Sequence, residues 1–129
     1  MAGKLLDSNV VIDLFREDLI TIEKLKSLPH IYIPVMVLGE LFYGANLSKQ
    51  IEKRVAQIRT FAAKVTVLNC DSVTAEMYGE IKSQLRRDGK PIPENDIWIA
   101  ALTKQYKLSI LSNDKHFTYI KGVRVESLK

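Results

Sequence analysis

The chain has 129 residues, of which 19 are Lys or Arg and 15 are Asp or Glu, so its formal net charge is +4. Hydrophobic residues make up 47% and charged residues 26%, and these ordinary values exclude a disordered or fibrous chain. The only cysteine, Cys70, excludes an internal disulfide and a thiolate-rich zinc site. The longest apolar runs, such as residues 31–38, are far shorter than the roughly 20 residues of a membrane span. We expect a single domain over residues 1–129, unprocessed and cytoplasmic.

Short β-branched or leucine-rich runs alternate with longer segments of helical periodicity along the whole chain. The short runs predict strands at residues 5–6, 31–33, 65–68, 109–112 and 123–126. The longer segments predict helices at residues 10–14, 22–28, 36–45, 49–64, 73–87 and 97–106. This alternation is typical of an α/β fold in which helices flank a mainly parallel central sheet.

The residue types also predict where some helices begin and end. Ser8 or Asn9 is expected to cap the first helix, and Asp71 is expected to cap the helix at 73–87. The segment 88–93 contains one glycine and two prolines, so we expect a loop there. This loop leads to Asp96 at the start of the next helix.

Four acidic residues occupy informative positions in this pattern. Asp7 and Asp114 end apolar strands, Asp96 opens a helix after a loop, and Glu40 interrupts an apolar helix. The carboxyl ends of parallel strands and the adjacent helix N-termini lie at one edge of the sheet, where ligands bind. Three of the four acids are therefore expected to meet there.

Each acid also has a purely structural explanation. Asp7 and Asp96 are suitable helix caps, Asp114 is a suitable turn residue, and Glu40 is a suitable exposed helix residue. However, Asp7 and Asp96 each stand beside another good capping residue, so capping does not require the acid. Glu40 has mainly apolar neighbours along its helix. Taken together, the four acids favour a shared site.

The sequence around each acid forms a recognisable segment: LLDSNVVIDLF at Asp7, VLGELFYGA at Glu40, PENDIWIAA at Asp96 and LSNDKHF at Asp114. In this order, the four segments resemble the acidic motifs of PIN-domain ribonucleases of the VapC toxin type. The resemblance spans nearly the whole chain. Ser8 stands where threonine is common in the family, and a hydroxyl is retained. Some relatives have a further acid where this chain has His116.

The resemblance implies a PIN fold, RNA cleavage that depends on Mg²⁺ or Mn²⁺, and inhibition by a co-expressed antitoxin. Such a partner would lay a helix or an extended tail across the acidic site, with an arginine as its anchor. The resemblance also implies dimers. The helix at 36–45 agrees, because it has apolar residues on more than one face, namely Leu38, Leu41, Phe42 and Tyr43. We therefore expect a homodimer.

Hydrolysis of a phosphodiester needs a nucleophilic water near a polyanion, which carboxylates alone would repel. A divalent cation reverses the local field, and carboxylate oxygens suit Mg²⁺ or Mn²⁺ better than zinc. Asp7, Asp96 and Asp114 are expected to coordinate the metal directly or through water. Glu40 is expected either to coordinate the metal or to deprotonate the attacking water.

Several neighbouring polar residues have a less specific assignment. Asn9, Ser112 and Asn113 could hold the carboxylates through hydrogen bonds, although turn and cap roles explain them equally well. Lys115 is the most direct choice for contact with the RNA backbone, because it follows Asp114. For His116, an exposed turn position is the favoured interpretation over contact with the substrate.

Other functions are also consistent with an α/β chain. A phosphotransferase of the haloacid-dehalogenase type needs a second acid two residues after the strand-end aspartate, and Asn9 stands there instead. A response-regulator receiver domain needs paired acids after its first strand, where this chain has only Asp7. The remaining alternative is a non-catalytic PIN-like module that acts with a small partner in a DNA-binding repressor complex.

Overall fold

A five-stranded sheet organises the chain, and its strands all run parallel. The computed structural model describes residues 3–128. The strand order is β3-β2-β1-β4-β5, with β1 at Lys4–Leu6, β2 at Ile31–Pro34, β3 at Thr66–Leu68, β4 at Ser109–Leu111 and β5 at Arg124–Glu126. The predicted α/β fold and the five predicted strands are confirmed.

Six α-helices and one 3-10 helix join these strands in the described part of the chain. Their bounds are Ser8–Phe15 (α1), Leu19–Lys26 (α2), Val35–Leu47 (α3), Ile51–Ala62 (α4), Ser72–Arg87 (α5), Glu94–Gln105 (α6) and Lys115–Tyr119 (η1). Each predicted helix is present. The segment between β4 and β5, for which no helix was predicted, forms η1.

The starts of two helices differ from the prediction. Asp7 itself caps α1, in place of Ser8 or Asn9, because its side chain accepts a hydrogen bond from the Ser8 backbone N–H. Helix α6 begins at Glu94, with Pro93 in the cap position and Asp96 inside the first turn. Proline is tolerated there because the first N–H groups of a helix have no partner within the helix.

Both ends of α5 agree with the predictions made from the sequence. The Asp71 side chain accepts hydrogen bonds from two backbone N–H groups, and Thr74 completes the capping box, so the predicted cap is confirmed. After the helix, Gly89 has a φ of 66°, a value that glycine adopts without steric cost. The Lys90 N–H then donates to the Leu85 carbonyl, as in a Schellman motif. The chain is thereby turned toward α6.

The hydrophobic core lies around the central strands. Leu5, Leu6, Ile33, Ile110 and Leu111 are fully buried, as expected for strands covered on both faces. Each such side chain contributes roughly 1.5–3 kcal/mol through removal from water. The burial pattern explains why the strands read as short apolar runs without alternation. No helix in residues 3–128 is long and apolar enough to cross a bilayer.

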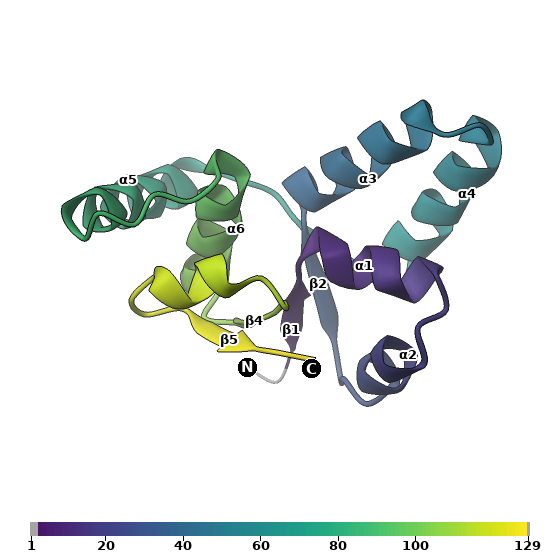
Figure 1. Cartoon of the computed structure of the whole chain (residues 1–129), viewed down its shortest axis with the longest axis horizontal. Helices are drawn as coiled ribbons and strands as arrows, with labels where there is room; N and C mark the ends of the chain where they lie inside the picture. The colour runs from purple at the N-terminus through teal and green to yellow at the C-terminus, as the bar shows by residue number, and fades with distance from the viewer. Residues whose placement is uncertain (1–2, 129) are drawn as a thin grey trace.

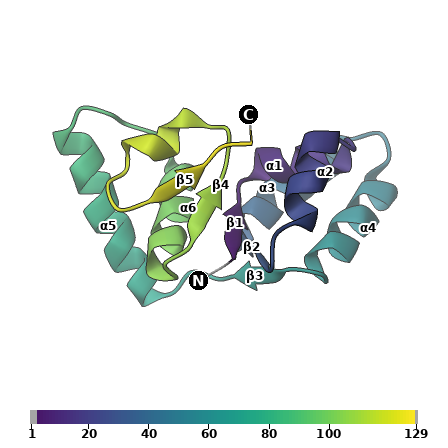
Figure 2. The ribbon, with the colours of Figure 1, turned by 90° about the horizontal axis from the view of Figure 1, so that it is seen from below.

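Strand β1 lies between β2 and β4, so the chain leaves the centre of the sheet in two directions. Figure 1 shows α3 and α4 on one side of the carboxyl end of β1, and α5 and α6 on the other. Figure 2 shows the same division from below, with β1 and β2 between α5 and α4. In open parallel sheets, such a switch in direction is where ligands bind.

Candidate active site

Asp7 is the buried centre of the site. It directly follows β1, and only 4% of its surface is exposed. Its Oδ1 accepts a hydrogen bond from the Ser8 N–H, and its Oδ2 accepts one from the Ser112 hydroxyl, both at 2.7 Å. Burial raises the pKa of Asp7 and the charge of Asp114 raises it further, against the effect of these hydrogen bonds.

Glu40 on α3 reaches the same place from the other side. The Ser8 hydroxyl donates a hydrogen bond to its Oε2 at 3.2 Å and also lies 3.4 Å from Oδ1 of Asp7. Partial burial of the carboxyl and the charge of Asp7 raise the pKa of Glu40, whereas hydrogen bonds to Ser8 and Asn95 lower it. Glu40 therefore forms the outer rim of a cluster whose centre is Asp7.

Asp96 in the first turn of α6 shows the largest perturbation. Its pKa is raised to about 6, first by burial and then by the charges of Asp7, Asp114 and Glu40, while His116 lowers it. Carboxylates held this close repel one another, and a cation among them would relieve the repulsion. The cluster is therefore suited to bind a cation.

Asp114 is held at the start of η1. Its Oδ1 accepts a hydrogen bond from the His116 N–H at 2.9 Å, and its own N–H donates to the Ser112 hydroxyl at 3.0 Å. The His116 Nδ1 lies 3.0 Å from Oδ1 of Asp114 and 3.8 Å from Oδ2 of Asp96. Asp114 thus has the predicted turn geometry and also lies within the cluster.

Of the other predicted residues, only some contact the acids. Ser112 bridges Asp7 and Asp114. Asn9 is exposed on α1, and the hydrogen bonds to the Asp7 carboxylate in the described part of the chain come from Ser8 and Ser112 instead. The Asn113 side chain accepts a hydrogen bond from Ser127 instead of supporting a carboxylate. Lys115 is exposed at the first position of η1.

Three contributors were missed by the sequence analysis. Ser8 was expected to cap a helix but bridges Asp7 and Glu40, and its hydroxyl at a family threonine position was the available signal. Asn95, the polar residue beside Asp96, was not assigned to the site but hydrogen-bonds Glu40. His116 was expected to be an exposed turn residue, but it is half-buried against two acids.

The donor set fits a divalent cation. Asp96, Asp114 and His116 each offer one ligand atom, and these atoms all lie within 4.8 Å of one another. This set does not include Asp7 or Glu40, which act on Asp96 through their charge. Carboxylate oxygens are preferred ligands of Mg²⁺ and Mn²⁺.

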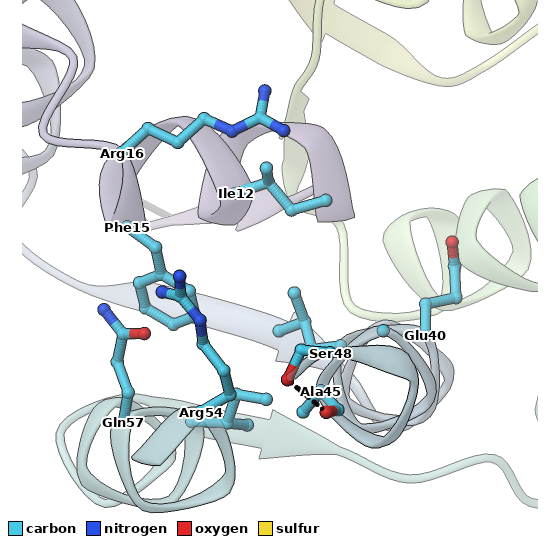
Figure 3. A pocket seen from close by; sticks show the side chains of 11 residues that line it. Ile12, Phe15, Arg16, Glu40, Ala45, Ser48, Arg54 and Gln57 are labelled. Atoms are coloured by element: carbon cyan, nitrogen blue, oxygen red, sulfur yellow. Dashed lines mark hydrogen bonds between the residues drawn. The ribbon is translucent and has the colours of Figure 1, made fainter. Parts of the chain in front are cut away.

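A pocket of about 320 Å³ lies between α1, α3 and α4. Its walls are largely apolar and include Phe15 and Leu41, and two arginines, Arg16 and Arg54, also line it. Figure 3 shows Glu40 at one end of this pocket and Phe15 and Arg16 at the other. Because Glu40 lines the pocket and also belongs to the acidic cluster, the two features are continuous.

Known proteins resemble this chain over most of its length. The PIN domain family model matches residues 4–123. Ribonuclease VapC2 of Haemophilus influenzae (strain ATCC 51907) is 32% identical to the chain, with 98% of both sequences covered. The tRNA(fMet)-specific endonuclease VapC of Shigella flexneri is 34% identical, with 73% of this chain and 72% of the relative covered.

Solved structures show the same fold. A chain of the DNA-bound VapBC from Salmonella typhimurium matches with a TM-score of 0.92 and 27% identity, covering 100% of both chains. A chain of VapBC-1 from nontypeable Haemophilus influenzae matches with a TM-score of 0.88 and 25% identity over 98% of both chains. The chain belongs to the PIN domain family and is homologous to the VapC toxins of VapBC toxin-antitoxin systems.

Proposed function

We propose that this chain is a metal-dependent endoribonuclease, the toxin of a VapBC-like pair, which hydrolyses RNA phosphodiester bonds at the acidic cluster. The main support is the convergence of Asp7, Glu40, Asp96 and Asp114 from four separate segments at the switch point of the sheet. Relatives named as a ribonuclease and as a tRNA-specific endonuclease support RNA as the substrate.

Each acid has a distinct part in this proposal. When bound, Mg²⁺ or Mn²⁺ would neutralise phosphate charge and lower the pKa of a water molecule that it coordinates. Asp96 and Asp114 supply oxygen ligands at the cluster, and Asp7 adds its buried charge directly or through water. Glu40, at the rim with a raised pKa, is positioned to take a proton from the attacking water. Ser8 and Ser112 keep the carboxylates in place.

Lys115 is proposed to contact the RNA backbone. It is exposed and directly follows Asp114, so its ammonium group can approach a phosphate at the edge of the cluster. Cytoplasmic RNA is the proposed substrate.

The activity can be tested by incubating the chain with bulk tRNA and with single-stranded RNA in Mn²⁺, in Mg²⁺ and in EDTA. We expect cleavage with either metal, no cleavage in EDTA, and defined fragment ends. RNA that stays intact in both metals would contradict the proposal and favour a non-catalytic module in a DNA-binding complex.

We further propose that an antitoxin segment covers the site, with an arginine at the carboxylates and an apolar side chain in the pocket beside Glu40. Solved VapBC complexes among the relatives support such a partner. Gly44 lines the pocket, and no atom from outside its own stretch of helix backbone lies within 4 Å of the position of a Cβ atom, so Gly44→Leu would add a bulky side chain to the pocket wall.

This variant should lose its small partner on co-purification from the native host, while wild type retains it. Gly79→Leu is the matched control, because Gly79 has equally open surroundings on α5, away from the pocket. Wild type that purifies without any small protein would contradict the proposed partner.

A homodimer through α3 is also proposed. Val35, Gly39, Tyr43 and Leu47 are exposed and lie four residues apart, on one face of the helix. Of the residues expected to form this surface, Leu41 is buried and Leu38 and Phe42 are half-buried, so only Tyr43 belongs to it. The exposed apolar face of α3 therefore keeps Tyr43 from the predicted set and adds Val35 and Leu47.

A further inference from the structure

His116 has an unusual environment that the roles of the four acids do not explain. Its Nδ1 atom is buried, yet it makes no hydrogen bond within residues 3–128, and 36% of the side chain as a whole is exposed. The same atom lies 3.0 Å from Oδ1 of Asp114 and 3.8 Å from Oδ2 of Asp96. A buried ring nitrogen between two carboxylates, without a hydrogen bond, is suited to share a ligand with them.

The backbone holds the ring in this position. The His116 N–H donates to Oδ1 of Asp114 at 2.9 Å, and the next residue, Phe117, is fully buried in the core. The Tyr119 ring packs nearby, with 6.1 Å between the two ring centroids. The side chain is therefore anchored on both sides of its Cα atom, and its nitrogen faces the acids.

We propose that Nδ1 of His116 is a ligand of the divalent cation, together with Asp96 and Asp114, and that this nitrogen makes the site prefer Mn²⁺ over Mg²⁺. The proposal rests on the proposed function in that the cation is the one RNA cleavage would use. In an octahedral site with bonds of about 2.1 Å, neighbouring ligand atoms lie about 3.0 Å apart and opposite ones about 4.2 Å apart. The separations of 3.0 Å and 3.8 Å between Nδ1 and the two carboxylate oxygens are compatible with this range.

The metal preference follows from ligand chemistry. Mg²⁺ takes oxygen ligands and keeps much of its water, whereas imidazole nitrogen binds first-row transition metals well. An all-carboxylate cluster would discriminate weakly between the two ions. One nitrogen donor at this position would raise the affinity for Mn²⁺ more than the affinity for Mg²⁺.

The direct test is electron spin-echo spectroscopy of Mn²⁺ bound to the intact chain without RNA. Wild type should show modulation from a coordinated ¹⁴N nucleus, and His116→Gln should lose it. His30→Gln is the matched control, because His30 is the only other histidine and lies just before β2, where its Nε2 contacts the Thr66 hydroxyl at 2.7 Å. This control should keep the nitrogen signal.

Calorimetric titration with Mn²⁺ and with Mg²⁺ gives a second readout. The ratio of the two affinities should fall about tenfold in His116→Gln, within the range seen when the surroundings of a metal site are changed. His116→Asp, which replaces the nitrogen donor with a carboxylate, should keep Mg²⁺ binding and lose the nitrogen signal, so the test stays informative if the glutamine variant folds poorly. No nitrogen signal in wild type, or an unchanged affinity ratio in both variants, would overturn the proposal.

These outcomes are separate from those of the nuclease test. A nitrogen-ligated Mn²⁺ in a protein that leaves RNA intact would contradict the ribonuclease function and leave the ligand assignment standing. RNA cleavage by a protein whose Mn²⁺ shows no nitrogen signal would support the ribonuclease function and contradict the assignment of His116 as a ligand.

Discussion

The Ser112 hydroxyl donates a 2.7 Å hydrogen bond to Oδ2 of Asp7 and thereby joins the carboxyl ends of β4 and β1. Both residues are buried, and the same hydroxyl accepts a 3.0 Å hydrogen bond from the Asp114 N–H. One small side chain therefore sets the positions of two acids. It does so where burial makes an unsatisfied carboxylate costly.

Replacing this residue, in Ser112→Ala, should lower the free energy of unfolding by about 1–3 kcal/mol, because a buried acceptor and a backbone donor lose their partner. Mn²⁺ affinity should also fall, since Asp7 and Asp114 lose their fixed positions. Chemical denaturation and Mn²⁺ titration would measure both effects. Ser83→Ala removes an exposed hydroxyl on α5 and is the control. Equal stability and equal Mn²⁺ affinity of Ser112→Ala and wild type would refute this prediction.

Asp96→Asn should separate structural from functional roles of the acids. Without metal, the variant should be as stable as wild type or more stable, by up to about 3 kcal/mol, the equivalent of a pKa shift of two units. It should lose RNA cleavage and most of the stabilisation by Mn²⁺. Thermal melts in EDTA and in excess Mn²⁺ test this, with Glu76→Gln, an exposed acid on α5, as control. Wild-type cleavage together with an undiminished metal-induced rise in Tm would remove Asp96 from the site.

The raised pKa of Asp96 also predicts a pH dependence for the metal-free protein. Its folded pKa is about 6 and its ordinary value is 3.8. Below 3.8 the carboxyl is protonated in both states; as pH rises toward 6 the unfolded chain ionises first, so stability falls. Asp7 and Glu40 are shifted in the same direction. The stability advantage of Asp96→Asn over wild type, measured by denaturation in EDTA, should therefore grow between about pH 4 and 6. A constant difference across this range would contradict the prediction.

The positions of the acids could be predicted because they depend on local sequence. Asp7 and Asp114 follow apolar strands, and the carboxyl ends of parallel strands share an edge whatever the details of packing. Asp96 was expected at the start of a helix and lies in the first turn of α6. The apolar runs, the breaks at glycine and proline, and the Asp71 cap gave the rest of the architecture.

The contacts that complete the site could not be predicted, because they depend on how separate elements pack. Ser8 and Glu40 are 32 residues apart and meet only because α1 packs on α3. The position of His116 depends on η1, a short helix without its own periodic pattern. Asn113 shows the opposite case, because its side chain is engaged by the segment after β5 and not by an acid.

The exposed apolar face of α3 predicts a homodimer, which a single glutamate introduced on this face should dissociate. Tyr43 and Leu47 are 67% and 69% exposed, and burying a glutamate against the same face of a second copy would leave a charge without a partner. Light scattering at micromolar concentration should give about twice 14.7 kDa for wild type, and about 14.7 kDa for Tyr43→Glu and Leu47→Glu. Leu19→Glu, at a 75% exposed position on α2, should remain dimeric. A wild-type mass near 14.7 kDa would exclude the dimer, and a dimeric Leu47→Glu would place the interface elsewhere.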